Sequence, residues 1–394
     1  MKPTIHAIKE KLLAKGVVMP NPESVYISDD VDPDRIAGDN VTFFAGCKIV
    51  GSRTLILPGT RIGYEAPATL ENCLVGKDVC LNGGFFQEAV FLGGNAFGAN
   101  AHVREGTIME ENASAAHTVG LKQTILFPFV ILGSLINFCD CFMAGGTSRK
   151  NHSEVGSSFV HFNYTPNQDK ATPSMMGNVH QGVMLDQHPI FLGGQGGLVG
   201  PLRIGFGCLT GAGSIVRKDE ERPDRMILAQ GTHTGSFPRW FGLRSGSDRI
   251  FNHNIRYLAG LTALKAWYVH VRPLFAADAM SRELVRGLQT TLDGCIAERI
   301  RQLEKFCDTL GPSQTHDPIL AGMEKAVKQF GNHATAPAMM THEGNSFVVR
   351  TAAMAAQKSW DYVSTIQGFS GELKSLGSAW LLDIEKTLSD PLLV

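Results

Sequence analysis

The sequence has few of the features that mark secreted, membrane or metal-binding proteins. Its eight cysteines are scattered between Cys47 and Cys307 and none forms a Cys-x-x-Cys pair, so we expect no zinc ribbon and no dithiol redox site. No apolar run approaches the roughly 20 residues of a membrane-spanning helix, and residues 1–15 lack the apolar core of a signal peptide. We therefore expect no membrane partner and a reduced, cytoplasmic protein.

A surplus of charge of one sign is also missing, because 36 Lys and Arg residues balance 37 Asp and Glu residues. Proteins whose main partner is nucleic acid or an acidic membrane surface usually carry a basic surplus. We expect neither partner for this chain. Its 394 residues are enough for two or three domains with a sizeable core.

Glycine, in contrast, is abundant, with 43 residues concentrated between Gly38 and Gly246. In the same region interior-type residues recur every six positions, a period that is neither helical nor that of a plain strand. This period fits short strands and turns, three of which close one triangular coil of a β-helix. A Gly-rich β-sandwich would instead give turn signals about every 8–12 residues. The recurring positions are Phe44, Val50, Ile56 and Ile62; Phe97, Val103, Met109, Ala115, Leu121 and Phe127; and Leu192, Leu198, Ile204, Thr210 and Val216.

Helical periodicity replaces the six-residue period beyond Val216. A short helix is also predicted at Ile5–Lys15, whereas residues 311–345 are rich in loop signals. The predicted domains are an N-terminal helical lead (1–22), a β-helix (23–237) and an α-helical domain (238–394). Two apolar stripes in the last domain are formed by Ile255, Leu258, Leu261, Leu264, Trp267 and Val271, and by Leu284, Leu288, Leu292, Ile296, Ile300 and Leu303.

The six-residue repeats, together with Asn163-Tyr164 and Lys170, resemble the hexapeptide-repeat acyltransferases over about residues 27–219. The likeness is greatest to the acetyltransferase domain of the bifunctional UDP-N-acetylglucosamine pyrophosphorylase/glucosamine-1-phosphate acetyltransferases. The resemblance implies an all-β solenoid, a left-handed parallel β-helix, followed here by the α-helical C-terminal domain. It also implies a homotrimer with sites between subunits, acetyl-CoA as co-substrate, and a sugar or nucleotide-sugar substrate.

Site residues follow from the same resemblance. Arg104 and Lys122 keep the family's spacing of eighteen and correspond to residues that hold phosphates. Asn163, Tyr164 and Lys170 correspond to residues that contact the substrate and acetyl-CoA. Gly194 and Ala212 are expected beside the pantetheine arm of the co-substrate, although a glycine-rich segment here also fits a tight turn between coils.

Two departures from the family pattern limit the comparison. The sequence has no counterpart of the nucleotidyltransferase half, so we expect no pyrophosphorylase activity. The catalytic histidine of the family follows a glycine, and the corresponding pair in this chain is Gly133-Ser134.

Acyl transfer to an amine needs a base with a pKa near neutrality, and histidine is the side chain best suited to that role. The polar segment Gly145–Ser174 offers His152 and His161, with His117 as a lesser candidate. We expect His161 to point outward if its neighbours in the strand point inward. Each histidine could equally be a hydrogen-bonding residue of the surface. Arg149-Lys150 in the same segment could bind an anion or simply be solvated.

Two other functions remain open on this sequence. Loss of the usual base is compatible with a non-catalytic, trimeric sugar-nucleotide-binding scaffold. A γ-carbonic-anhydrase-like zinc enzyme would need three convergent imidazoles from two subunits, from among His152, His161, His180 and His188. Because the histidine spacing of those enzymes is not reproduced, no bound metal is predicted.

Overall fold

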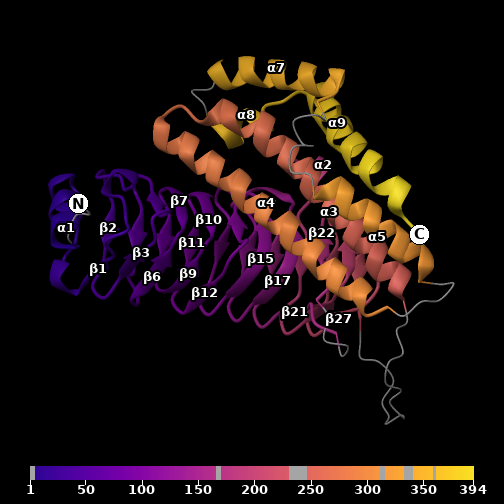
Figure 1. Cartoon of the computed structure of the whole chain (residues 1–394), viewed down its shortest axis with the longest axis horizontal. Helices are drawn as coiled ribbons and strands as arrows, with labels where there is room; N and C mark the ends of the chain where they lie inside the picture. Colours follow the sequence, from indigo (N-terminus) through magenta and orange to yellow (C-terminus); the bar gives the residue numbers. More distant parts are fainter. Residues whose placement is uncertain (1–4, 166–169, 230–245, 311–315, 332–339, 358–360) are drawn as a thin grey trace, which may run out of the picture.

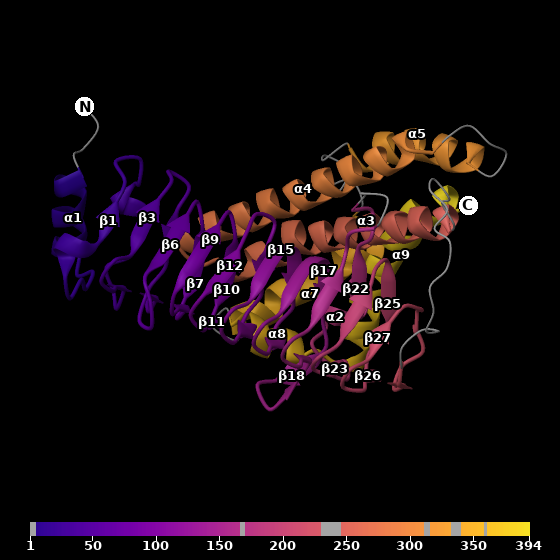
Figure 2. The same ribbon diagram turned by 90° about the horizontal axis from the view of Figure 1, so that it is seen from below.

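The computed structural model describes residues 5–165, 170–229, 246–310, 316–331, 340–357 and 361–394. Figure 1 shows a long solenoid of parallel strands that begins at the N-terminus, with a group of helices packed along one side of its C-terminal half. Figure 2, turned by 90°, shows α3 (Ser247–His270) and α4 (Ala279–Asp308) lying roughly parallel to the long axis of this solenoid and ending before its N-terminal coils. The predicted β-helix with a helical C-terminal region is therefore confirmed.

Parallel strands stack into three faces, one strand per face and coil. Strands β15 and β17 are long because each crosses the corner between the first and second faces without a break. The first face holds β1 (Tyr26–Ile27), β3 (Lys48–Val50), β6 (Ala68–Glu71), β9 (Gly84–Gln87), β12 (Ala101–Val103), β15 (Gly120–Leu126), β17 (Asn137–Met143), β21 (Val160–Phe162), β24 (Gly197–Val199) and β27 (Ile215–Val216). The second face holds β4 (Leu55–Ile56), β7 (Leu74–Lys77), β10 (Val90–Gly93), β13 (Ile108–Met109), the ends of β15 and β17, β22 (Ser174–Met176) and β25 (Leu202–Ile204). The third face holds β2 (Thr42–Phe43), β5 (Arg61–Ile62), β8 (Cys80–Leu81), β11 (Ala96–Phe97), β14 (Ser114–Ala115), β16 (Ile131–Leu132), β20 (Glu154–Val155), β23 (Phe191–Leu192), β26 (Leu209–Thr210) and β28 (Met226–Ile227).

The interior of the solenoid is filled by the residues of the six-residue period. Phe86, Phe91 and Phe97 come from three faces of one coil, are fully buried and pack edge to face at 5.7–5.9 Å between ring centroids. Such contacts add to the burial of apolar area that holds the coil closed. The second and third series of recurring positions, from Phe97 to Phe127 and from Leu192 to Val216, are buried as predicted.

In the first series of recurring positions, Phe44 to Ile62, the first two predicted interior residues are wrong by one position. Phe43 and Ile49 fill the interior, whereas Phe44 and Val50 are only partly buried. The reason is that the step from Ile49 to the next interior residue, Ile56, is seven residues long.

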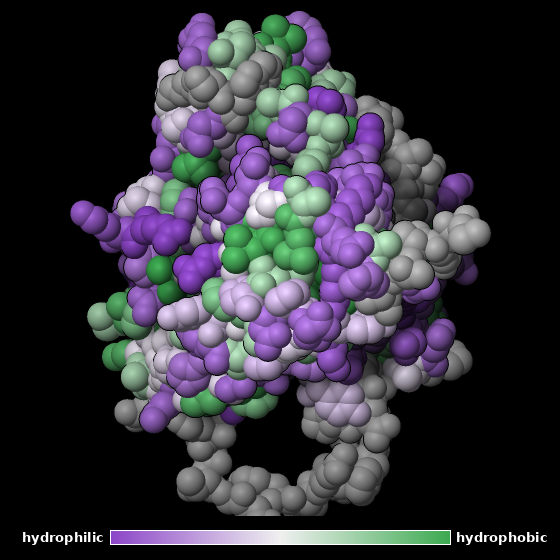
Figure 3. Space-filling model, turned by 90° about the vertical axis from the view of Figure 1, so that its left-hand side faces the viewer, coloured by the Kyte–Doolittle hydropathy of each residue, from purple (hydrophilic) through white to green (hydrophobic). Residues whose placement is uncertain are grey.

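The short elements and helices complete the structure. Helix α1 (Ile5–Ala14) covers the N-terminal end of the solenoid with Ile8 and Leu12, which are fully buried. Seen from this end, the surface is mostly hydrophilic around a small hydrophobic area (Figure 3).

The remaining elements are η1 (Pro22–Ser24), η2 (Pro33–Arg35), β18 (Gly146–Ser148), β19 (Asn151–His152), α2 (Val179–Gly182), α3 (Ser247–His270), η3 (Arg272–Phe275), α4 (Ala279–Asp308), α5 (Asp317–Phe330), α7 (His342–Gln357), α8 (Tyr362–Gln367), α9 (Gly371–Ser389) and η4 (Asp390–Leu392).

Helices α3 and α4 carry the two predicted apolar stripes on their buried sides. The loop-rich interpretation of residues 311–345 is wrong in part, because α5 lies there and buries Ile319, Met323, Ala326 and Phe330. The predicted boundary at 237/238 lies outside the described residues. No helix in the described part of the chain is long and apolar enough to span a bilayer.

A buried ionic cluster fixes the helical region to the solenoid. The Arg272 guanidinium contacts Glu110 and Glu111 at 2.6 Å each, and the Tyr268 hydroxyl donates a hydrogen bond to the Glu110 carboxylate. The Arg272 guanidinium also stacks 3.6 Å from the ring centroid of Tyr362. The solenoid and the helices therefore share one continuous core.

Candidate functional site

The site is built on the corner between the first and second faces, which we call the helix-side edge. Asn72, Gln123 and Asp140 turn this corner with φ between 49° and 57°, a conformation that asparagine, glutamine and aspartate adopt at some cost. Successive coils contribute Arg53, Asn72, Glu88, Glu105 and Gln123 to the edge, and α4 runs beside it. Asp140 follows at the same corner on the next coil.

Arg104 and Lys122 are neighbours on this side of the first face. Val103 pairs with Leu121, so a spacing of eighteen residues corresponds to one coil and sets Arg104 beside Lys122. Lys122 in turn pairs with Cys139 on the next coil. The Lys122 ammonium lies 2.6 Å from Glu105, and Nη2 of Arg104 lies 3.9 Å from the Cys139 sulfur.

Asp140, the residue after Cys139, joins Asn163 to Arg299 of α4. Asn163 donates from Nδ2 to one carboxylate oxygen of Asp140 at 2.7 Å. Arg299, from α4, donates to the other oxygen at 3.1 Å and to the Lys170 carbonyl at 3.0 Å. We call Arg104, Lys122, Lys170 and Arg299 the cation cluster.

The pKa of the Cys139 thiol depends on the charges of the surrounding cluster. Burial and then Asp140 raise the pKa of this thiol, whereas Arg104, Lys122 and Lys170 act in the opposite direction. The structure thus brings together four of the predicted residues, Arg104, Lys122, Asn163 and Lys170. Tyr164 follows Asn163 and is half exposed.

Arg299 and Asp140 were not predicted as site residues. Arg299 lies within the apolar stripe of α4, next to Ile300, where its guanidinium is almost fully buried. A cation between the apolar positions of an amphipathic helix was the available signal, because such a side chain must find a partner when the helix packs.

The predicted outward orientation of His161 is wrong. His161 is 3% exposed, whereas its neighbour Phe162 is 46% exposed. The imidazole donates from Nδ1 to the Cys139 carbonyl at 2.6 Å and accepts at Nε2 from the Ser174 hydroxyl at 2.7 Å. Burial lowers the pKa of His161 to about 4. It lies directly beneath the cluster, but both ring nitrogens are occupied.

His152 lies apart from the cation cluster, in the β18–β19 hairpin that leaves the corner between the second and third faces. Its Nδ1 donates to the Arg149 carbonyl at 3.0 Å, and its Nε2 lies 3.3 Å from Glu154. Arg149 binds the Gly94 carbonyl at 2.9 Å and the Asn112 side chain at 3.0 Å. Arg149 therefore fastens the hairpin to earlier coils.

The predicted co-substrate residues lie on the corner between the third and first faces, which we call the far edge. Gly194 and Ala212 are on successive coils, and the Gly213 amide donates to the Gly194 carbonyl at 2.9 Å. Ser134 lies on the same edge, where its amide donates to the Ser157 hydroxyl. His117 is exposed one coil before Ser134. The far edge and the cation cluster thus border the same face on opposite sides.

The histidines considered for zinc do not converge. His180 pairs with Glu385 of α9 and His188 pairs with Asp224, whereas His152 and His161 have the separate partners described above. Within the described ranges, no three His, Cys, Asp or Glu side chains are grouped as a metal site requires.

Comparisons with known proteins agree with the resemblance drawn from the repeats. No family model matches the sequence. The chain is 28% identical over 214 residues to the bifunctional protein GlmU of Thermotoga maritima, which covers 53% of this chain and 42% of the relative. It is 26% identical over 234 residues to the bifunctional protein GlmU of Streptococcus agalactiae serotype V. This match covers 57% of this chain and 44% of the relative.

The chain therefore spans less than half the length of these curated relatives. Among solved structures, LpxA from Acinetobacter baumannii is similar over 55% of this chain and 70% of its own, with 14% identity and a TM-score of 0.21. The matches to the GlmU proteins bear out the resemblance to the hexapeptide-repeat acyltransferases.

Proposed function

We propose that the chain is an acyltransferase that moves an acetyl or another acyl group from CoA to an amino sugar, a sugar phosphate or a nucleotide sugar. The observation that carries this proposal is the cation cluster. Arg104, Lys122 and Lys170 come from different coils and loops, yet all three act electrostatically on the one thiol of Cys139 at the helix-side edge, where Arg299 binds Asp140 and the Lys170 carbonyl. Such a gathering of cations suits a phosphorylated acceptor.

Arg104 is the cation best placed to bind an anion. It makes no salt bridge with any described residue, and its Nε atom is buried without a hydrogen-bond partner. Lys122 already has a carboxylate partner in Glu105, which remains partly exposed. A phosphate placed here would give Arg104 a charged partner and would share Lys122 with Glu105.

The division of the site between two edges supports a homotrimer with sites between subunits. Gly194 and Ala212 at the far edge would contact the acyl-CoA of one chain, and the cation cluster would hold the acceptor on its neighbour. The third face is available for such packing, because Phe191 and Met226 project from it and are 40% and 70% exposed. All eight cysteines are unpaired, which suits the reducing cytoplasm where acyl-CoA is made.

In the reaction, the acceptor amine attacks the thioester carbonyl, a base takes the ammonium proton, and CoA leaves as its thiolate. His152 stays the candidate base, from a neighbouring subunit in the assembled trimer. His161 is better suited to positioning, since its hydrogen bonds join Cys139 on β17 to Ser174 on β22 beneath Asn163.

A second candidate function is binding without catalysis. It is favoured by two observations: His161, beneath the cation cluster, is buried, and Ser134 occupies the position of the family's catalytic histidine. In this case the trimer would hold a sugar nucleotide and transfer nothing.

The two functions are separated by one pair of measurements. Purified protein is mixed with acetyl-CoA and a panel of glucosamine, glucosamine 1-phosphate and UDP-linked amino sugars. Release of CoA, detected by a thiol reagent, supports the transferase. A rise in melting temperature without CoA release supports the binding protein, and the absence of both effects contradicts the two proposals together.

A further inference from the structure

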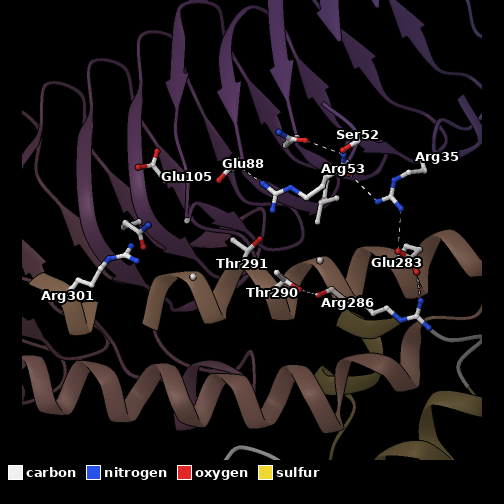
Figure 4. A pocket seen from close by; sticks show the side chains of 16 residues that line it. Arg35, Ser52, Arg53, Glu88, Glu105, Glu283, Arg286, Thr290, Thr291 and Arg301 are labelled. Atoms are coloured by element: carbon white, nitrogen blue, oxygen red, sulfur yellow. Dashed lines mark hydrogen bonds and ion pairs between the residues drawn. The ribbon is translucent and has the colours of Figure 1, made fainter. Parts of the chain in front are cut away.

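A groove of about 580 Å³ runs between α4 and the helix-side edge of the solenoid. Figure 4 shows its two walls, with Arg35 and Arg53 on the solenoid side and Arg286 and Arg301 on the α4 side. Glu105 and Gln123 line the groove at the coils that also carry Arg104 and Lys122. The groove therefore lies next to the cation cluster, and Glu105 belongs to its lining while pairing with Lys122.

The α4 wall is shaped by two glycines with different surroundings. A Cβ atom built on Gly287 would lie 1.9 Å from Leu74, so the helix touches the solenoid here. A Cβ atom built on Gly294, two turns later, would have no neighbour within 4 Å. The helix thus packs closely at Gly287 and leaves open space at Gly294.

The charges in the groove are arranged for exchange with a ligand. Arg53 pairs with Glu88 at 2.7 Å and Arg35 pairs with Glu283 at 3.4 Å, and both pairs are at least partly exposed. Exposed ion pairs contribute about 1 kcal/mol or less, so an acidic ligand can replace the carboxylate at small cost. The lining itself holds four arginines and three glutamates, and Arg301 has its carboxylate partner, Glu298, outside the lining at 2.6 Å.

The chemistry of the lining indicates the class of ligand. Besides these charges it offers the hydroxyls of Ser52, Thr290 and Thr291 and the amides of Asn72 and Gln123. None of the described residues that line the groove is aromatic, so it has no surface on which a nucleobase would stack. Hydroxyls, amides and guanidinium groups without aromatic rings suit a chain of acidic sugars.

We propose that this groove is an acceptor subsite that binds an acidic, hydroxyl-rich carbohydrate segment extending from the reacting sugar at the cation cluster. This inference rests on the proposed function. It means that the acceptor is longer than a single sugar phosphate, and that α4 contributes directly to substrate selection.

The test uses the full-length protein and isothermal titration with two probes, a hyaluronan tetrasaccharide and glucosamine 1-phosphate. Gly294→Phe fills the groove, and Gly294→Ala is its matched control because the added methyl group meets nothing. We expect Gly294→Phe to weaken tetrasaccharide binding by about tenfold or more, a difference of about 1.4 kcal/mol. Gly294→Ala should leave tetrasaccharide binding unchanged, and neither variant should alter glucosamine 1-phosphate binding.

The outcomes are distinguishable from failure of the proposed function. Glucosamine 1-phosphate binding and CoA release in a protein that does not bind the tetrasaccharide would overturn the subsite and leave the transferase intact. Tetrasaccharide binding that is equal in both Gly294 variants would place the ligand elsewhere and also overturn it. Absence of binding by either probe, with no CoA release, would overturn both. Uncharged N-acetylchitotetraose should bind more weakly than the acidic tetrasaccharide, and equal binding would contradict the role given to the arginines.

Discussion

Arg299 of α4 donates a hydrogen bond to Asp140 across 3.1 Å, at the residue where β17 turns the helix-side edge. This single contact joins the helical region to the coil that also presents Cys139 to Arg104 and Lys122. The position of α4, and with it one wall of the groove, is thus coupled to the geometry of the cation cluster.

Removal of Arg299 should destabilise the protein strongly. Arg299→Met leaves the largely buried Asp140 carboxylate without its cationic partner, and broken buried pairs typically cost about 3–5 kcal/mol. Arg301→Met, two positions along the same helix, removes an exposed partner of Glu298 and should cost about 1 kcal/mol or less. Chemical unfolding of both variants measures the difference. Equal losses would mean that the Arg299–Asp140 pair contributes no more than a surface pair.

Removal of Arg104 should weaken binding of a phosphorylated acceptor without changing stability much. Hydrogen bonds to a charged group contribute about 1.5–3 kcal/mol, so Arg104→Met should raise the Kd for glucosamine 1-phosphate by about 10- to 100-fold. Lys150→Met, in the exposed turn of the β18–β19 hairpin, is the control because it removes the same charge away from the cluster. If the two variants bind equally well, Arg104 is not a phosphate ligand.

The buried imidazole of His161 should make stability depend on pH. Its folded pKa of about 4 lies below the ordinary value of 6.5, so the unfolded chain takes up a proton first as the pH falls. The free energy of unfolding should therefore decrease by about 3 kcal/mol between pH 6.5 and 4 relative to His161→Gln. NMR titration of the unsubstituted, folded protein should give the imidazole a pKa of about 4. An imidazole that titrates near 6.5 in the folded protein would contradict this prediction.

A bulky residue at Ala212 should block the co-substrate alone. Ala212 is exposed at the far edge, so Ala212→Trp should fold normally while covering the path expected for the pantetheine arm. We expect acetyl-CoA binding to weaken by about tenfold or more, with glucosamine 1-phosphate binding unchanged. Ala14→Trp, exposed on α1, introduces the same side chain at a distance and serves as control. Unaltered acetyl-CoA affinity in Ala212→Trp would remove Gly194 and Ala212 from the proposed site.

The third face should hold the proposed trimer together. Sedimentation equilibrium should give three times the 42.6 kDa chain mass for the unsubstituted protein. Phe191→Glu would bury a charge without a partner in the interface and should shift the mass toward a single chain. Leu13→Glu on α1 is matched in exposure, 41% against 40% for Phe191, and should leave the mass unchanged. A trimer that persists in Phe191→Glu would exclude this face as the interface.

Much of the solenoid could be predicted because one residue in six must enter a narrow interior. Arg104 and Lys122 could be placed together for the same reason, since eighteen residues complete one coil. The orientation of His161 could not, because a shift of one residue in a strand exchanges the inner and outer side chains. Asp140 acquires its role only when Arg299 reaches it, and nothing local in the sequence states which side of α4 meets which coil.

The regular stacking of coils places the residues of the helix-side edge at equal intervals along the groove. Neighbouring coils are separated by about 4.8 Å, so the four steps from Arg53 to Gln123 span about 19 Å along the groove. A stiff solenoid keeps this length constant whatever is bound. Insertion or deletion of one coil between Arg53 and Gln123 would therefore change the reach of the groove by one fixed increment, without altering the chemistry at the cation cluster. In this way the number of coils, rather than any single side chain, would set the length of the segment that the groove accommodates.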